Sequence, residues 1–484
     1  MNQGTWGQGY FEDCCYTCGF YRETAPNWLD FCAILRGIRP PREMGANFRY
    51  LELGSGMGFN LCLLAAAYPE GSFVGIDFNA DQIAHGKDLA ERLQLENIGF
   101  QEADFIELAQ PNDAQAGFPE HRSFDYISLH GVLTWVTEPI QRALALCIER
   151  FIKPGGLVYC SYNTNPGWQA GSIFRQIAEY ERRHEPRSTP DRAYERARQK
   201  LSALLSYDDN QPSSLARQTP AIESLIAEIS KQSPYYLLHE YANAGWNPLY
   251  VNDAHALLAS RQILFIGSGN PPELLPELIP IRIRTLLDSE TDLSSRELLY
   301  DIATCRRFRR DIFTRGRCAM TSHERSKRLE RLMFTDTRSS DYSFKPLQTD
   351  FGEVSTDGDT INRVFRQLSK GPCSLRVLSE AVGHSLEHTA GLICMLLSQG
   401  AAGISSPSAA GASPSSQAIN IQLAKLIRDG RPYAYLCAPA IGSAVTITIE
   451  QADALLHHLD QGDSPAAEAI QPLLPLLARV ACLC

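Results

Sequence analysis

The stretch Tyr50-Leu-Glu-Leu-Gly-Ser-Gly-Met-Gly58 decides the fold class of this chain. Its first residues are apolar around a single acid, as in a buried strand, and three glycines alternate directly after them. An apolar segment at residues 61–68 follows and is predicted to be helical. Glycines at such a point let the backbone approach a ligand and open a helix N-terminus toward it. The turn alone is equally compatible with a tight strand-to-helix connection that binds no ligand. The neighbouring sequence is needed to distinguish the two.

Further strands are predicted on the C-terminal side of this turn. They cover residues 72–77, 98–104, 124–131 and 157–162, and helical spacing of apolar residues marks 80–93 between the first two. Strands that alternate with helices indicate βαβ units with right-handed crossovers. The sequence therefore predicts an α/β fold with a parallel sheet.

Acidic residues stand at the ends of the predicted strands. Glu52 lies in the first strand, Asp77 ends the second, and Asp104 ends the third with Phe105 beside it. A carboxylate in the position of Asp77 can accept both ribose hydroxyls of a bound nucleoside. Asp104 can accept from an adenine amino group. The glycine spacing is G-x-G-x-G, which differs from the G-x-G-x-x-G of dinucleotide binders.

In this order and spacing the motifs ELGSGMG, VGID, EADF, FDYISLHGVL and KPGGLVYCSYN resemble the class I S-adenosylmethionine-dependent methyltransferases, over about residues 45–165. The resemblance implies a doubly wound, Rossmann-like sheet of seven strands with S-adenosylmethionine across the carboxyl ends of the strands. It implies that the glycines face the methionine part, Asp77 the ribose and Asp104 the adenine. The residues expected to bind the cofactor are Tyr21, Glu52, Gly54, Ser55, Gly56, Gly58, Asp77, Phe78, Asp104, Phe105 and His130.

The flanking sequence is similar to bacterial methyltransferases with an appended methyltransferase regulatory domain. The similarity is carried by Phe20-Tyr-Arg-Glu23, by residues 237–259 and by Phe308-Arg-Arg-Asp311. Relatives of this kind include the rickettsial protein lysine methyltransferases. We expect a methyltransferase domain at 1–206, a regulatory domain at 207–285 and a mostly helical C-terminal domain at 286–484. The composition of residues 401–418 predicts a loop in this last domain.

Candidate acceptor residues follow the fourth and fifth predicted strands. His130 either orients the acceptor, takes a proton, or only bonds to backbone or cofactor. Tyr21, Trp135, Tyr162 and Asn163 are candidates for an aromatic channel around an aliphatic amine, and His130, Tyr162, Asn163 and Trp135 are the predicted catalytic set. Trp168 is expected to pack against the next helix. The D/N-P-P-Y signature of enzymes acting on amides or base amines is absent.

Three functions remain compatible with these motifs. The first is methyl transfer to lysine side chains of a protein, the second methylation of a small metabolite or natural product at N or O, and the third a non-catalytic cofactor-binding module. A net charge of −10 and a pI of about 5.6 argue against nucleic acid as the main partner. No apolar run reaches the ~20 residues of a membrane span. We expect a cytoplasmic protein with reduced thiols; its oligomeric state stays open.

Other clusters receive structural interpretations. Cys14, Cys15 and Cys18 are expected to be plain thiols, because a zinc site requires a second pair at suitable spacing, and no metal is predicted. The arginine-rich segment 306–331 is expected to pair with carboxylates of neighbouring elements. Residues 374–400 have the pattern of a helix-turn-helix, but the second helix carries almost no positive charge, so a packing module is predicted.

Overall fold

The computed structural model describes residues 18–110, 120–185, 189–208, 211–232, 237, 240–241, 243, 245–340, 342–406, 414–462, 465–480 and 482–483. Of the predicted cysteine cluster, Cys14 and Cys15 lie outside the described residues. Over these ranges no helix is both long enough and apolar enough to cross a membrane. In the same parts of the chain, no three His, Cys, Asp or Glu side chains are grouped to hold a metal ion.

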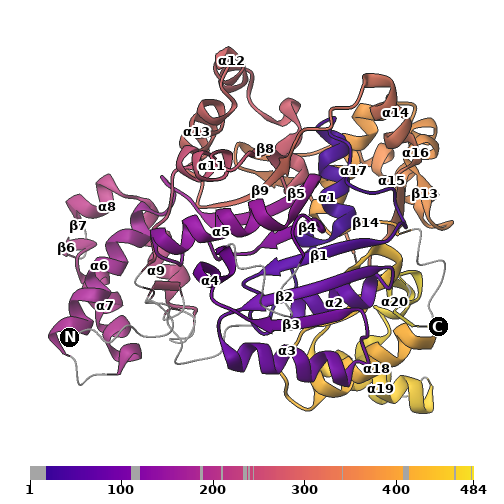
Figure 1. Cartoon of the computed structure of the whole chain (residues 1–484), viewed down its shortest axis with the longest axis horizontal. Coiled ribbons are helices and arrows are strands. Elements are labelled where there is room, and N and C mark those ends of the chain that lie inside the picture. Colours follow the sequence, from indigo (N-terminus) through magenta and orange to yellow (C-terminus); the bar gives the residue numbers. More distant parts are fainter. Residues whose placement is uncertain are drawn as a thin grey trace.

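A mixed sheet lies at the centre of the described structure, with seven strands in the order β3-β2-β1-β4-β5-β9-β8 (Figure 1). The strands are β1 (Phe48–Leu53), β2 (Gly71–Asp77), β3 (Ile98–Glu102), β4 (Phe124–Leu129), β5 (Ile152–Asn163), β8 (Ile263–Ser268) and β9 (Phe308–Arg315). β1 to β5 pair in parallel, with Leu51 beside Val74 on one side and Ile127 on the other. β9 runs antiparallel to both β5 and β8. The predicted doubly wound fold is confirmed.

Helices cover both faces of this sheet and create two apolar cores. One core contains α1 (Pro26–Leu35), α2 (Phe59–Ala67) and α3 (Ala80–Arg92), and the other contains α4 (Phe105–Ala109), α5 (Glu138–Phe151) and α11 (Val251–Ala259). Successive residues of a strand point to opposite faces, so Tyr50 enters the first core and Leu51 the second. The carboxyl ends of the parallel strands stay uncovered by these helices, which is where a ligand can bind.

The last two strands of the sheet come from beyond the predicted methyltransferase domain. β9 pairs with β5 from Leu157 opposite Thr314 to Asn163 opposite Phe308, so residues beyond 285 complete the methyltransferase sheet. β8 lies at its outer edge and comes from the predicted regulatory domain. Antiparallel strands that return after a long insertion leave no βαβ signal in the sequence, and the domain boundaries at 206 and 285 stay a prediction.

A helical arm projects from one side of the sheet (Figure 1). It consists of α6 (Gln169–His184), α7 (Pro190–Ala203), α8 (Ser214–Gln218), α9 (Ala221–Ile229) and the short strands β6 (Ser206–Asp208) and β7 (Gln211–Pro212). Its core is aromatic and includes Trp168, Phe174, Tyr194, Tyr241 and Trp246. Trp168, which follows β5, is part of this core.

The arginine-rich segment connects the sheet to its neighbours as predicted. α12 (Ile281–Ser289) and α13 (Leu293–Thr304) precede β9, and α14 (Ser322–Arg331) follows it. Arg306 forms ion pairs with Glu273 and Asp350, and Arg328 forms one with Glu43. The interpretation as internal pairing is confirmed for these arginines.

A three-stranded sheet of order β13-β10-β14 follows, formed by β10 (Met333–Asp336), β13 (Cys373–Ser374) and β14 (Ala402–Ile404). Around it lie β11 (Leu347–Thr349), β12 (Gly352–Val354), α15 (Gly358–Leu368), α16 (Leu375–Val382) and α17 (Leu386–Ser398). Residues 389–397 of α17 are buried, so the helix-turn-helix is a packing module as predicted. The predicted loop at 401–418 is wrong at its flanks, which are β14 and the start of α18; residues 407–413 lie outside the described ranges.

The C-terminal part packs against the helices that follow the glycine turn (Figure 1). It comprises α18 (Pro414–Arg428), the hairpin β15 (Tyr435–Ala438) and β16 (Ser443–Thr446), α19 (Ile449–Gln461) and α20 (Leu474–Arg479). The Tyr433 ring stacks on Phe59 at 4.6 Å between centroids. The Asn27 amide donates to the carbonyls of Ile404 and Ile441 at 2.9 and 2.8 Å. These contacts hold α1 and α2 in place behind the glycine turn.

Candidate active site

The glycine turn after β1 adopts the conformation that its composition predicts. Gly54, Gly56 and Gly58 all have positive φ, at 77°, 52° and 73°. A Cβ on Gly54 would lie 2.5 Å from the Val132 side chain, and one on Gly58 would lie 2.7 Å from the Phe100 ring. Gly54 and Gly58 are therefore required by close packing, whereas a Cβ on Gly56 would have no neighbour closer than 3.8 Å. The exposed side of the turn is thus at Gly56.

Asp77 sits at the end of β2 and is bonded to the glycine turn. Its carboxylate accepts from the backbone N–H of Gly56 at 2.9 Å and of Asn79 at 3.1 Å. The side chain is buried, and burial raises its pKa to about 6 in spite of these two donors. The next residue, Phe78, is partly exposed. A buried carboxylate with remaining lone pairs can accept further hydrogen bonds from a ligand.

Glu52 lies beneath the turn and is incompletely bonded. Its Oε1 accepts from the Asn60 amide at 3.0 Å and from the Ser128 hydroxyl at 3.4 Å. Its Oε2 is buried and has no partner among the described residues, and the same holds for the Ser55 hydroxyl. Burial raises the pKa of Glu52 to about 8. Buried polar atoms without partners are costly, which points to a polar ligand at this turn.

Asp104 and Phe105 lie at the end of β3 with different roles. Asp104 caps α4, since its Oδ1 accepts from the N–H of Ile106 at 2.6 Å. Phe105 is buried in the core under α5, where its carbonyl accepts from the Cys147 thiol. Asp104 is placed at the predicted edge of the sheet. The core position of Phe105 argues against its predicted place beside an adenine ring.

His130 follows β4 and is held between two aromatic rings. It stacks on Tyr21 at 3.5 Å between centroids and lies parallel to Tyr159 at 6.0 Å. Its Nδ1 is 3.3 Å from the Tyr159 hydroxyl and 3.2 Å from the Ser161 hydroxyl. Burial lowers the pKa of the imidazole to about 3, so His130 is neutral at physiological pH. The backbone N–H of Tyr21 donates to Asn60, which links this stack to the start of α2.

A cavity of about 450 Å³ opens beside this stack. Aromatic side chains and one buried carboxylate characterise its wall, which consists of Tyr21, His130, Gly131, Thr134, Trp135, Asn163, Trp168, Glu240, Arg307 and Phe308. The Asn163 amide donates to Glu240 Oε1 at 3.1 Å. Burial raises the pKa of Glu240 to about 7. Arg307 pairs with Glu228 at 2.8 Å and lies over the Trp168 ring, so its charge is already compensated.

Tyr162 is not brought into this cavity, contrary to prediction. Its ring is fully buried in the core, and its hydroxyl donates to Asp311 Oδ2 at 2.6 Å. Arg309 and His255 also contact this carboxylate, and their charge and hydrogen bonds keep the pKa of Asp311 below its ordinary range. The reason is the strand alternation on β5: Asn163 faces the cavity, so its neighbour Tyr162 faces the other side. Trp135 and Asn163 do line the cavity as predicted.

Comparison with known proteins agrees with this geometry. Residues 45–204 match a family described as "Methyltransferase domain", and residues 233–315 match "Predicted methyltransferase regulatory domain". Over 380 residues the chain is 31% identical to the uncharacterized protein sll1526 of Synechocystis, covering 78% of this chain and 72% of that protein. It is 29% identical to the uncharacterized protein RP789 of Rickettsia prowazekii, covering 60% of this chain and 49% of that protein.

The chain belongs to the class I S-adenosylmethionine-dependent methyltransferases that carry a methyltransferase regulatory domain. Among solved structures, PKMT2 from Rickettsia typhi in complex with AdoHcy shares its fold, with a TM-score of 0.69, 18% identity, and coverage of 93% of this chain and 89% of that one. The regulatory region of this methyltransferase, 233–315, contains both antiparallel strands of the catalytic sheet.

S-adenosylmethionine, the cofactor of this methyltransferase, fits the residues at the turn. The cofactor carries an ammonium, a carboxylate and ribose hydroxyls, and no pyrophosphate. Glu52 Oε2 and the Ser55 hydroxyl are buried polar atoms that lack partners in the described structure, and Asp77 has lone pairs left beside Gly56. A donor and acceptor set of this kind suits an amino acid joined to a nucleoside.

Sequence reasoning missed five members of the cavity wall, namely Gly131, Thr134, Glu240, Arg307 and Phe308. The motif that contains Phe308 was recognised but assigned to a separate domain. Glu240 sits within the regulatory-domain pattern at 237–259, which gave no hint of a position beside β5. A signal was present only in the family resemblance, since nothing local distinguishes this glutamate from an ordinary helical one.

Proposed function

We propose that this methyltransferase transfers methyl groups to lysine side chains of a protein. The observation that carries the proposal is the wall of the 450 Å³ cavity, where Tyr21, Trp135 and Phe308 stand with the buried carboxylate of Glu240. Aromatic faces attract an alkylammonium group through cation–π contact, and a carboxylate compensates its charge. A hydroxyl or carbon acceptor would gain nothing from the cation–π contact.

The acceptor amine must lose a proton before it can attack. For an ordinary lysine with a pKa near 10.4, neutrality at pH 7 costs about 4.6 kcal/mol. An aromatic cavity disfavours the ammonium by removing water from it. Since burial raises the pKa of Glu240 to about 7, its carboxylate is a better proton acceptor than an exposed glutamate. In this proposal the Glu240 carboxylate accepts the proton from the lysine ammonium, and the Asn163 amide orients this carboxylate by donating a hydrogen bond to it.

His130 has a positioning role in this proposal. It is neutral, its Nδ1 is engaged by Tyr159 and Ser161, and it stacks on Tyr21 at the boundary between the glycine turn and the cavity. Such a rigid stack can align the amine with the methyl carbon and exclude water. When bound, S-adenosylmethionine supplies the methyl group on a positively charged sulfur.

The contacts to the cofactor are part of the proposal. Asp77 would accept from the ribose hydroxyls, Glu52 and Ser55 would bind the polar end of the methionine part, and Asp104 would accept from the adenine amino group. The buried partnerless atoms of Glu52 and Ser55 support this assignment for the methionine part. The name of the structural neighbour PKMT2, shared with the rickettsial protein lysine methyltransferases that the motifs resemble, supports the class of acceptor.

The test is transfer of radiolabelled methyl groups from S-adenosylmethionine into fractionated host lysate. We expect label in protein, located on lysine by mass spectrometry, and loss of most label with Glu240→Gln. The matched control is Glu195→Gln, since Glu195 is half-exposed on α7, pairs with Arg198, and neither of these residues lines the cavity. Label confined to the small-molecule fraction would replace the lysine assignment by a small-metabolite acceptor.

A further inference from the structure

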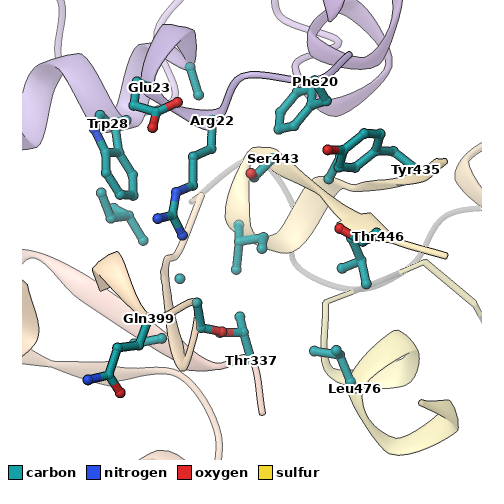
Figure 2. A pocket seen from close by; sticks show the side chains of 18 of the residues that line it. Phe20, Arg22, Glu23, Trp28, Thr337, Gln399, Tyr435, Ser443, Thr446 and Leu476 are labelled. Carbon is teal, nitrogen blue, oxygen red and sulfur yellow. The ribbon is translucent and has the colours of Figure 1, made fainter. Parts of the chain in front are cut away.

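A second hollow lies on the other side of Tyr21 from the acceptor cavity. It has a volume of about 620 Å³ and is bounded by the N-terminal segment, by β14 and by the β15–β16 hairpin. Figure 2 shows Arg22 reaching into it, with Gln399 and Thr337 on one side and Ser443 and Thr446 on the other. We call it the hairpin groove. None of the motifs for methyl transfer explains it.

The hairpin groove adjoins the acceptor cavity. Tyr21 lines both. On β9, Phe308 lines the cavity and Arg310 lines the groove, two residues apart on one face of the strand. The Arg310 guanidinium lies 5.1 Å from the centre of the Phe308 ring, and it pairs with Glu23 of the N-terminal segment at 3.4 Å. A chain bound in the groove would therefore lie next to the place where the acceptor amine is proposed to bind.

Two strand edges with unpaired backbone groups line the hairpin groove. In β16 the hydrogen bond from Ile447 N to Ala434 O fixes the alternation, so that the N–H and C=O of Ala444 and Thr446 point away from β15. In β14 the hydrogen bond from Ser405 N to Met333 O fixes the same alternation, so that the N–H and C=O of Ala402 point away from β10. Over the described ranges, these outward groups have no backbone partner. Such edges are templates for an additional extended chain.

The two edges meet at one end of the groove and leave a space between them. Ser406 N donates to Ala440 O at 2.8 Å where β14 and the hairpin come together. From that junction, β16 continues for four residues along the groove. At about 3.3 Å per residue this edge can pair with roughly four residues of an extended peptide.

Arg22 adds a charge preference. Its guanidinium donates to the carbonyls of Leu397 and Ser398 at the end of α17, at 2.8 and 2.9 Å. A guanidinium has five N–H donors, so further donors remain for a ligand. Among the described residues no carboxylate forms an ion pair with it, whereas Arg310 is paired with Glu23 and Arg338 with Asp336. The guanidinium also lies over the Trp28 ring at 5.0 Å and near Glu23, and its remaining donors favour an acidic side chain in the groove.

We propose that the hairpin groove binds an extended, acidic segment of the methyl-acceptor protein as an added β-strand next to the target lysine. The identity of the occupant rests on the proposed function. Main-chain hydrogen bonds to β16 and β14 give affinity for any extended chain, and Arg22 selects a glutamate or aspartate. The cavity beside His130 then binds the lysine side chain, while the groove binds the residues that flank it.

The test uses fluorescein-labelled peptides of about twelve residues with full-length protein, and binding is measured by fluorescence anisotropy. One peptide carries glutamates around a central lysine, a second has glutamine in their place, and a third has N-methylated backbone amides. We expect the acidic peptide to bind about tenfold more tightly than the glutamine peptide. We expect the N-methylated peptide to bind at least about tenfold more weakly than its unmethylated parent.

Variants separate the two contributions. Arg22→Gln should remove the difference between acidic and glutamine peptides, and Ala444→Pro, at an outward N–H, should weaken all unmethylated peptides alike. Arg376→Gln is the matched control, because that exposed arginine pairs with Glu330 outside the groove. Equal binding of all three peptides to the wild type would overturn the proposal. Wild-type binding by both Arg22→Gln and Ala444→Pro would overturn it as well.

The outcome does not depend on methyl transfer. Peptides with norleucine in place of lysine should still bind, because the groove contacts the backbone and the acidic side chains. Binding without methylation of the lysine peptides would leave the groove standing and count against the proposed function. If lysine peptides are methylated and neither Arg22→Gln nor Ala444→Pro changes their binding, the proposed function stands and the groove proposal is overturned.

Discussion

Replacement of Glu240 by glutamine should stabilise the protein in alkaline solution while it removes activity. Burial raises the pKa of Glu240 from its ordinary 4.5 to about 7, against the opposing influence of Arg307 and the hydrogen bond from Asn163. A carboxyl group whose pKa is higher in the folded than in the unfolded protein lowers the stability when it is ionised. At pH 4 Glu240 is protonated in both the folded and the unfolded protein, so stability is not lowered. The loss of stability begins at about pH 4.5 and is complete above pH 7. The full cost is about 3 kcal/mol at 1.36 kcal/mol for each pH unit.

Urea unfolding of wild type and Glu240→Gln at pH 4.5 and pH 8 measures this cost. The glutamine can still accept from Asn163, so the two proteins should have similar unfolding free energies at pH 4.5. The variant should be more stable by about 3 kcal/mol at pH 8. Methyl transfer should fall about a hundredfold or more if Glu240 takes the proton. A stability difference that does not change with pH would refute the buried, ionisable state, and unchanged turnover would refute its role as proton acceptor.

Three other substitutions test the remaining assignments. Tyr162→Phe should cost about 1–2 kcal/mol of stability, because Asp311 loses a donor, with turnover of the folded enzyme unchanged; a large drop in kcat would return Tyr162 to the site. Since burial raises the pKa of Glu52 to about 8, cofactor binding at pH 7 should release about one proton, and calorimetry in buffers of different ionisation heat should find none with Glu52→Gln. Gly58→Ala should cost about 2–4 kcal/mol in urea unfolding, from a positive φ and the clash with Phe100; a smaller loss would show that the turn can relax.

The parallel half of the fold was predictable because its signals are local. Each strand from β1 to β5 contains a short apolar run and precedes a helix, and β1, β2 and β3 end at or next to a glycine or an acid. The acids at these ends, such as Asp77 and Asp104, follow from strand topology, since parallel strands end on one edge of the sheet. The glycine conformations follow as well, because alternating glycines after a strand are compatible with few other geometries.

The remaining features depend on pairing between distant segments. β9 joins β5 across about 150 residues of sequence, and neither its position nor its direction can be read from its own eight residues. The face of Tyr162 depends on strand register, where an error of one residue exchanges core and cavity. Glu240 becomes a cavity residue only through packing of the helical arm against the end of β5. Such non-local placements carry no periodic signature.

The region named for regulation is physically part of the catalytic unit. Within 233–315, β8 and β9 complete the sheet, and Glu240, Arg307 and Phe308 form one wall of the acceptor cavity. Arg310 of the same strand lines the hairpin groove, so β9 contacts the catalytic core, the acceptor and the C-terminal part at once. Any shift of β9 relative to β5 would move the cavity wall and the groove together, whereas the glycine turn follows β1, which is separated from β9 by β4 and β5. In the function proposed above, β9 contributes to the acceptor side of the site, whereas the turns after β1 and β2 contribute to the cofactor side, and Tyr21 and His130 lie between the two.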